Sequence, residues 1–513
     1  MLERSILSSL AIVAVIAAPS AFAQSAPDIT GLAATAAQKG SVRVIVSFAE
    51  PATAKAAETA LTAAATARAD DAHRAALRVT QRALLASAFG KEVADSAIAG
   101  VEAVDPSNIT LMDVMPALAA TLTKEQLGRL AADPRVTSIV EDVLAKPTLN
   151  QSTAIIRMNG ATGAWSKGAH GGNRIVAVLD TGVNKNHEFL KFTTAATKVV
   201  SEACYNTNDA TYGSRSRCPG GAKQSTAAGS GADCTVFDGC GHGTHVAGIA
   251  AGKNTSANGS EPLKGVAFNA GVLAINVFSR FDRTHSTYPC GYGATKDCLL
   301  SWSSDQIKAM ERVYALRNGV GTRKIAAINM SLGGSAYTSF CNATNPTYTQ
   351  TVTKLRNAGI AVVIAAGNSY YTNAVSFPGC ISDATTVGAS TKTVSGSPEK
   401  IASYSNIGAA VDLLAPGGDF GYPASYGDAS QIYASYKGTN ATYAYLSGTS
   451  MAAPHVAGAF AAIKSRAACA NKTVAQIENA MKKTGFTITD TRSGGTLARK
   501  RINVTGVVTY LCP

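Results

Sequence analysis

Three residues whose side chains can together perform acyl transfer stand at separate points of the chain: Asp180, His242 and Ser450. A serine hydroxyl becomes a useful nucleophile only when an imidazole removes its proton. The imidazole in turn needs a carboxylate that fixes its tautomer and orientation. The order Asp, His, Ser along the chain is one of the known orders of such a triad. These residues predict that Asp180 orients the ring, His242 shuttles the proton and Ser450 attacks.

Each of these residues stands where a strand or a helix would hold it. Residues 175–179 are a short β-branched run, which predicts a buried parallel strand with Asp180 at its carboxyl end. Active sites of α/β folds gather at that edge of the sheet. Small residues follow His242, and they suit a helix packed tightly on the sheet. Ser450 opens a second such helix, whose N-terminal amides and dipole favour developing negative charge.

Other histidines and single motifs have plainer interpretations. His245 and His455 have apolar neighbours and are predicted to be packed core residues. An isolated Asp-Thr-Gly or Gly-Thr-Ser would be structural more often than catalytic. Three segments in the right order, each in its required context, favour the catalytic interpretation.

The segments 174–182, 241–248 and 448–455 resemble the motifs of the subtilase family of serine proteases, most of all its secreted, proteinase K-type bacterial members. The resemblance implies a three-layer, subtilisin-like α/β fold with a mostly parallel sheet. In this family the asparagine at the position of Asn368 donates a side-chain hydrogen bond to the tetrahedral intermediate, with the backbone amide of the serine as the second donor. An ordinary turn asparagine is the alternative for Asn368.

The same resemblance suggests the substrate-binding residues. The segment Ser331, Leu332, Gly333 and Gly334 matches one border of the primary specificity pocket, Ala365, Ala366 and Gly367 match the opposite wall, and Ser376 matches the floor. Because none of these positions holds a carboxylate, we expect a broad preference for apolar or aromatic P1 residues rather than basic ones. An extended peptide would bind by strand addition. The family also implies a cis bond at Phe377–Pro378.

A structural calcium ion is the one cofactor that the resemblance suggests. The chemistry itself requires no cofactor. Alignment with proteinase K-type chains suggests one structural calcium site formed by Ser382, Ala384 and Asp412. Calcium takes six to eight oxygen ligands, so a single acidic residue supports the site only weakly, and Asp412 could equally be a turn residue.

The first part of the chain differs from the rest. Residues 1–23 read as a signal peptide, because Arg4, an apolar run and a small-residue box at Ala21–Ala23 follow one another. Residues 24–148 hold no cysteine and read as a small α+β domain. We expect strands at 42–48, 115–122 and 135–141, and helices over much of 52–89 and after a capping box at 123–126.

This α+β segment resembles the inhibitory propeptides of subtilases, and a separate non-inhibitory domain is the alternative. Residues 149–513 then form the peptidase domain. Autocatalytic cleavage is expected within Val143–Gln151, where the tail of the propeptide would reach the active site.

Ten cysteines, all after residue 200, form an even number, which in an exported chain favours disulfides. Spacing suggests Cys290–Cys298, Cys341–Cys380 and Cys469–Cys512, and the four earlier cysteines would pair among themselves. Residues 201–240 and 279–303 look like stapled surface insertions.

Charge agrees with an extracellular enzyme rather than a nucleic-acid-binding protein. The chain carries +13, and residues 1–146 hold 13 basic and 15 acidic residues, which leaves +15 on the remainder. The basic residues are scattered and no nucleic-acid-binding motif accompanies them. No stretch after the signal peptide is long enough to span a membrane.

The sequence therefore predicts a secreted, monomeric serine endopeptidase that acts on proteins and peptides and is inhibited by its own propeptide. One alternative is an acyl transferase or peptide ligase that uses the same acyl-enzyme. The other is a basic, non-enzymatic binding protein on a subtilase scaffold.

Overall fold

The structure is a computed structural model of the chain. It describes residues 26–51, 63–99, 109–142, 144–145, 153–254, 263–392, 398–419, 430–492 and 494–513. The predicted signal peptide and most of the predicted cleavage window, Val143–Gln151, lie outside these residues.

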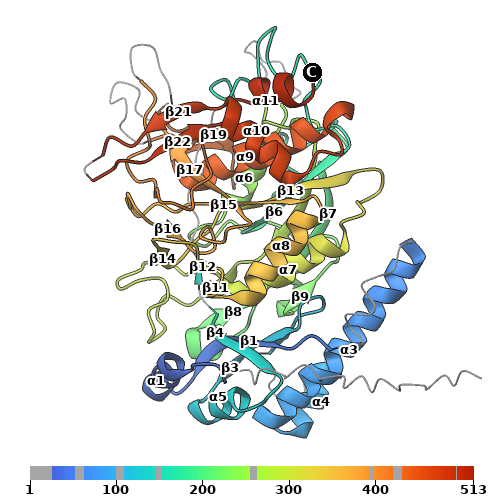
Figure 1. Cartoon of the computed structure of the whole chain (residues 1–513), viewed down its shortest axis with the longest axis vertical. Helices are drawn as coiled ribbons and strands as arrows, with labels where there is room; N and C mark the ends of the chain where they lie inside the picture. The colour runs from blue at the N-terminus through green and yellow to red at the C-terminus, as the bar shows by residue number, and fades with distance from the viewer. Residues whose placement is uncertain are drawn as a thin grey trace, which may run out of the picture.

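A large, mostly parallel sheet forms the centre of the fold (Figure 1). All its pairings from β7 to β22 are parallel, and only the two edge strands β9 and β21 run antiparallel. The strands follow in the order β21 (Phe486–Thr489), β22 (Ala498–Arg501), β18 (Leu413–Pro416), β17 (Thr385–Ser390), β15 (Ala361–Ala365), β13 (Lys324–Met330), β6 (Arg174–Asp180), β10 (Gly271–Asn276), β7 (Val199–Tyr205) and β9 (Gln224–Ser225).

Helices cover both faces of this sheet, which confirms the predicted three-layer α/β fold. One face packs on α6 (His242–Ala251), α9 (Thr449–Lys464), α10 (Val474–Thr484) and α11 (Val504–Leu511), and the other on α7 (Ser303–Ala315) and α8 (Pro346–Asn357). Successive residues of a strand point to opposite faces. In β6, Val176 and Val178 join the first apolar cluster, and Ile175 and Leu179 the second. This two-sided burial explains why the strand is apolar throughout.

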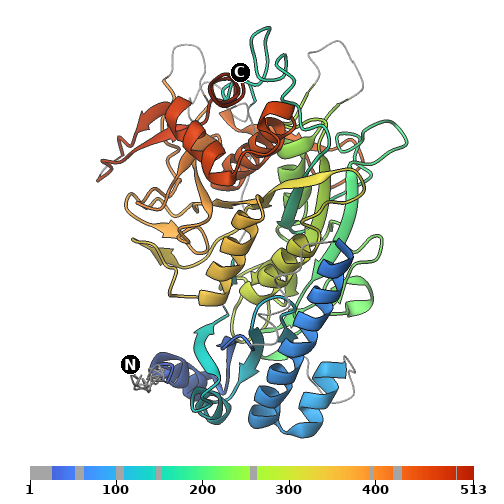
Figure 2. The same cartoon turned by 45° about the vertical axis from the view of Figure 1, so that its right-hand side comes forward.

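The N-terminal region forms a smaller unit at the end of the molecule beside α7 and α8 (Figures 1 and 2). Its four antiparallel strands lie in the order β2 (Thr110–Leu111), β3 (Ala117–Leu122), β1 (Val42–Phe48) and β4 (Val136–Glu141). Its helices are α1 (Thr30–Lys39), α3 (Ala63–Phe89), α4 (Lys91–Ala99) and α5 (Lys124–Ala131). The predicted α+β character and its three main strands are confirmed, whereas α1 and α4 were not predicted.

Local signals and packing agree in this region. Thr123 and Gln126 form the predicted capping box at the start of α5. On β1, Val44 and Val46 point into the core of the N-terminal region, while Ile45 joins the apolar cluster that contains α7 and α8. The second face of the small sheet is thus buried against the rest of the chain.

Disulfide pairing follows the expectation from spacing. The bonds are Cys204–Cys218, Cys234–Cys240, Cys290–Cys298, Cys341–Cys380 and Cys469–Cys512.

The interpretation of residues 201–240 and 279–303 as surface insertions is wrong in part. They supply most of β7 and three strands of a second sheet, β12 (Cys298–Trp302), β11 (Ser279–Phe281) and β8 (Ser214–Arg215), whose fourth strand is β5 (Leu144–Ala145). Phe281, Leu300 and Trp302 form a buried apolar cluster of their own. The short apolar pattern of β11 and β12 is hard to recognise in the sequence, because cysteines and glycines typical of loops surround it. Within the described ranges, no helix is both long and apolar enough to cross a membrane.

Candidate active site

Asp180 and His242 form a buried pair at the carboxyl edge of the large sheet. Asp180 is the last residue of β6, and His242 is the first residue of α6. His242 Nδ1 lies 2.6 Å from Asp180 Oδ1, and both side chains are almost fully buried. The backbone amide of Thr181 also donates to Asp180 Oδ1, at 2.7 Å. With Nδ1 engaged by the carboxylate, Nε2 is the basic nitrogen of the neutral ring.

Two glycines allow the loops that carry this pair to touch. A Cβ on Gly243 would lie 2.1 Å from the carbonyl oxygen of Gly182, so no larger residue fits at the start of α6. Gly182 itself has φ of +106°, which favours glycine. The backbone amide of Gly243 donates to Thr181 Oγ1 at 3.0 Å. The strand end and the helix start are thereby joined directly.

Ser450 reaches the same edge from α9. It is the second residue of that helix, and its Oγ donates to the carbonyl oxygen of Ser331 at 3.2 Å. Ser331 Oγ donates back to the carbonyl oxygen of Ser450 at 2.6 Å. Ser331 directly follows β13, the sheet neighbour of β6, and α9 packs against α6. Asp180, His242 and Ser450 are therefore gathered at one end of the parallel strands.

Asn368 lies beside the start of α9. Its Oδ1 accepts hydrogen bonds from the backbone amide and from Oγ1 of Thr449, both at 2.9 Å. Thr449 Oγ1 also accepts from the amide of Gly367 at 3.1 Å. These contacts fix the side-chain amide with its oxygen toward Thr449, the residue before Ser450. The Nδ2 group is then the donor that this side chain can present to a substrate.

The residues predicted to border the specificity pocket also come together. Gly334 donates its amide to the carbonyl oxygen of Phe377, and Ser376 donates its amide to that of Ala366, both at 2.8 Å. A Cβ on Gly367, where φ is +102°, would lie 2.2 Å from Ser376 Oγ. Asn406 Nδ2 donates to the same oxygen at 3.3 Å. The segments 331–334 and 365–367 thus both reach Ser376 and its neighbours, and the Phe377–Pro378 bond is cis, as expected.

The local contacts of the residues suggested for calcium do not favour a metal ion there. Lys482 Nζ lies 2.6 Å from Asp412 Oδ1, and the backbone amide of Thr386 donates to Oδ2 at 2.9 Å. An ammonium group already balances the only carboxylate among Ser382, Ala384 and Asp412. The described part of the chain contains no cluster of three or more His, Cys, Asp or Glu residues arranged to hold a metal. Calcium at this place stays a prediction that the local contacts do not favour.

The two further histidines of the motif segments, His245 and His455, are packed, as predicted. Both His245 and His455 are fully buried. Burial lowers the pKa of His245 to about 3, so its ring is neutral at physiological pH. Its Nε2 lies 3.1 Å from the carbonyl oxygen of Ala444, and His455 Nδ1 lies 2.7 Å from that of Met451.

Sequence reasoning missed two carboxylates that join distant segments. Asp233 bonds to Gly241 and Thr244, on either side of His242, and Glu311 on α7 binds the N-terminal region. No motif marks either residue, because their roles depend on contacts between distant segments.

Comparison with known proteins agrees with the geometry. Residues 171–502 match the model of the subtilase family. The chain is 30% identical over 396 residues to an extracellular protease of Xanthomonas campestris pv. campestris, covering 72% of this chain and 58% of that protein. It is also 30% identical over 354 residues to subtilisin NAT of Bacillus subtilis subsp. natto, covering 68% and 71% of the two chains.

A solved structure of a protease from Pseudoalteromonas arctica PAMC 21717 superimposes with a TM-score of 0.51 at 28% identity, over 69% of this chain and 94% of that one. The family match spans well over half of the chain and includes Asp180, His242, Asn368 and Ser450. The protein therefore belongs to the subtilase family.

Proposed function

We propose that this subtilase is a serine endopeptidase that cleaves peptide bonds through an acyl-enzyme on Ser450. The observation that carries the proposal is the 2.6 Å contact between His242 Nδ1 and Asp180 Oδ1 at the sheet edge that also holds Ser450. Family membership supports the coarser assignment to the serine proteases.

Each side chain has a defined role in the reaction. His242 Nε2 takes the proton of Ser450 Oγ as this oxygen attacks the carbonyl carbon of the substrate. Asp180 keeps the Nδ1–H tautomer and stabilises the imidazolium that forms. Asn368 Nδ2 and the backbone amide of Ser450 donate to the oxyanion. His242 then protonates the leaving amine, and a water molecule, deprotonated by the same ring, releases the acid product.

Protein substrates follow from the family, and the pocket residues suggest their side-chain preference. Ser376 and Asn406 supply uncharged polar groups at the proposed floor of the P1 pocket. No carboxylate is present at the pocket positions 331–334, 365–367 and 376. A basic P1 side chain would find no counter-ion among them, so we propose an apolar or aromatic preference.

The N-terminal region, residues 24–148, is proposed to act as an intramolecular inhibitor. Its tail strand β5 pairs antiparallel with β12, where Leu144 faces Trp302 and Ala145 faces Ser301. This is the strand addition expected of a bound peptide. The autocatalytic cut is proposed within Val143–Gln151, directly after or within this paired segment.

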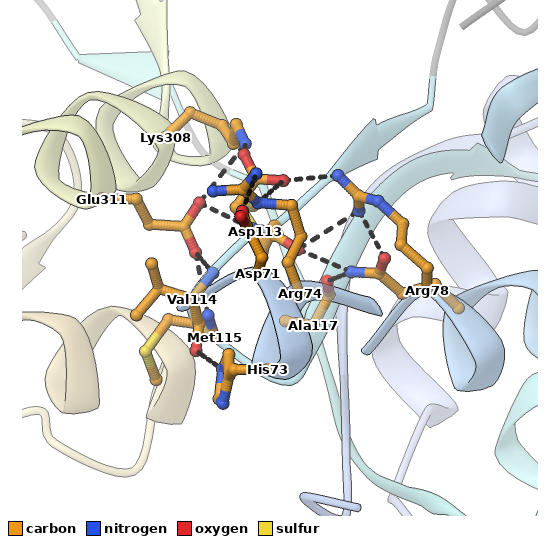
Figure 3. A network of polar contacts seen from close by, with 12 residues as sticks. Asp71, His73, Arg74, Arg78, Asp113, Val114, Met115, Ala117, Lys308 and Glu311 are labelled. Atoms are coloured by element: carbon orange, nitrogen blue, oxygen red, sulfur yellow. Dashed lines mark hydrogen bonds and ion pairs between the residues drawn. The ribbon is translucent and has the colours of Figure 1, made fainter. Parts of the chain in front are cut away.

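A second contact supports the inhibitor proposal (Figure 3). Glu311 on α7 accepts hydrogen bonds from three successive backbone amides of the N-terminal region, those of Asp113, Val114 and Met115, at 2.8–2.9 Å. Asp113 itself forms an ion pair with Lys308 of α7. Glu311 and Lys308 are both buried and lie 3.4 Å apart, and the N-terminal region supplies further partners for both charged groups.

We further propose that the enzyme is secreted and monomeric. The five disulfides suit an oxidising compartment, and the Xanthomonas relative is named an extracellular protease. The signal peptide expected at residues 1–23 would provide the export step.

Labelling with a serine-directed sulfonyl fluoride tests the proposal. The wild-type enzyme should incorporate the reagent and lose activity, while Ser450→Ala should do neither. Label on the wild type without any peptide cleavage would favour a ligase, which a comparison of hydrolysis and aminolysis of a peptide ester identifies. Absence of label would support a non-enzymatic binding protein.

A further inference from the structure

The start of α6 lacks a cap of its own. The residue before His242 is Gly241, with φ of +92° and no side chain to accept a hydrogen bond from the first turn. Helix starts expose amide groups that normally need such a partner. Because the first residue of this helix is the proposed general base, the contacts that hold the helix start also set the position of the imidazole.

The first-turn amides of His242 and Gly243 donate to the carbonyl oxygen of Gly239 and to Thr181 Oγ1, and Asp233 holds the helix start on either side of them. Its Oδ1 accepts the backbone amide of Gly241 at 3.0 Å, and its Oδ2 accepts Thr244 Oγ1 at 2.5 Å. These two donors come from the residues one before and two after His242. The Cys234–Cys240 disulfide closes the intervening loop and keeps the carboxylate near the helix start. A negative charge is also favourable at the N-terminal end of a helix dipole.

The same carboxylate is tied to the loop that carries Asp180. Thr244 Oγ1, which donates to Asp233, accepts the backbone amide of Asn184 at 2.8 Å. The backbone amide of Val183 donates to the carbonyl oxygen of Gly231 at 2.8 Å, two residues before Asp233. Asp233 therefore connects the segments that hold both members of the Asp180–His242 pair.

From this geometry we infer that Asp233 is a positioning residue for His242, acting through Gly241 and Thr244. The inference rests on the proposed role of His242 as general base. Asp233 touches no reacting atom; its carboxylate accepts the backbone amide of Gly241 before His242 and the side-chain hydroxyl of Thr244 after it. Burial raises its pKa to about 6, against hydrogen bonds that lower it, so the carboxylate is largely ionised at pH 7 and above. Arg217 is the charged group that favours this ionised form.

Substitution of Asp233 by Asn keeps the shape of the side chain but replaces one acceptor oxygen by a donor. If the amide nitrogen takes the Oδ1 position, it meets the backbone amides of Gly241 and Cys234, and donor faces donor. If it takes the Oδ2 position, it can donate to Thr244 Oγ1 only after the hydroxyl proton of Thr244 has turned away, which reverses this hydrogen bond. In both orientations the negative charge at the helix start is lost, and in the first a link to Gly241 is lost as well.

The test combines kinetics with a spectroscopic probe of the His242–Asp180 hydrogen bond. We expect Asp233→Asn to lower kcat by about 10- to 100-fold with KM nearly unchanged, because displacement of a catalytic group by a fraction of an ångström costs rate rather than binding. Rates are normalised to sites titrated by the sulfonyl fluoride. The downfield proton resonance of Nδ1–H, assigned by its loss in His242→Ala, should shift or broaden.

Matched variants separate positioning from general destabilisation. Thr244→Val should lower kcat as Asp233→Asn does, whereas Thr244→Ser, which keeps the hydroxyl, should have a nearly normal kcat. In the double variant Asp233→Asn/Thr244→Val, the loss of kcat should be clearly less than the two single losses combined. Glu478→Gln is the control, because Glu478 is a buried carboxylate that is paired with Arg356 away from the site. It should leave both kcat and the resonance unchanged.

A kcat of Asp233→Asn within twofold of wild type, or an unchanged resonance, would overturn the inference. An equal defect in Glu478→Gln would also overturn it, since the effect would then be general. If wild-type Ser450 takes no label, the proposed function fails, and the resonance still reports whether Asp233 holds the ring.

Discussion

Replacement of Asn368 by Ala tests the oxyanion contact most directly. The side chain does two separable things in this structure. Its Oδ1 accepts two hydrogen bonds from Thr449, and its Nδ2 is the proposed donor to the oxyanion. The first role concerns the folded state, and the second concerns only the transition state.

The two roles predict different magnitudes. Loss of one oxyanion donor should lower kcat by about 10²–10³, or roughly 2.7–4 kcal/mol, a value known from subtilisin, a relative of this chain. KM should change little, because the negative charge develops only during the reaction. Loss of the two Thr449 bonds should cost stability of about 0.5–1.5 kcal/mol each.

Asn368→Asp separates the two roles. Aspartate retains an acceptor for Thr449 but offers no donor, and it places negative charge near the oxyanion. We therefore expect Asn368→Asp to keep more of the thermal stability than Asn368→Ala while losing at least as much kcat. Steady-state kinetics on a peptide ester and thermal unfolding of the same samples measure both. A kcat for Asn368→Ala within fivefold of wild type would refute the oxyanion assignment.

Three further predictions concern other contacts. Ser450→Ala should accumulate as an uncut precursor detectable by N-terminal sequencing, whereas His245→Ala should mainly lower the melting temperature; autonomous processing of purified Ser450→Ala would contradict this. Glu311→Gln in the mature enzyme should weaken its inhibition by added residues 24–148 at least about tenfold. The substitution removes the negative charge of the carboxylate that accepts three backbone hydrogen bonds from this region. A chelator should leave the melting temperature of the wild-type protein unchanged, because Lys482 already neutralises Asp412. In Lys482→Met, a chelator should lower the melting temperature only if calcium can bind Asp412 in place of the ammonium group.

Much of the fold can be predicted from the sequence, because the local sequence pattern of many elements agrees with their packing in the folded protein. The run 175–179 is apolar at every position, and β6 is indeed buried on both faces. The capping box at Thr123 predicts the start of α5 because the two hydrogen bonds involve residues only three apart. Such signals need no knowledge of the rest of the chain.

Other features depend on distant partners and leave no local pattern. The composition of residues 279–303 predicts a surface insertion that includes Trp302, yet its ring is buried beside Phe281 and contacts Arg43 of the N-terminal region. Lys482 meets Asp412 across 70 residues, and this pairing changes the interpretation of a suggested metal ligand. The sequence alone shows Asp412 as an acidic residue, but it does not show that Lys482 already neutralises this carboxylate in the fold.

Close packing of small residues links the fold to the site. Helices α6 and α9 approach each other through positions such as Gly458, where a Cβ would lie 2.9 Å from the carbonyl oxygen of Ala250. His242 and Ser450 are the first and second residues of these two helices. The distance between the proposed base and nucleophile is therefore set by the helix contact as well as by the loops. Glycine and alanine in the helix bodies matter to the site as much as the polar residues at the helix starts, because a larger side chain would move both proposed catalytic groups at once.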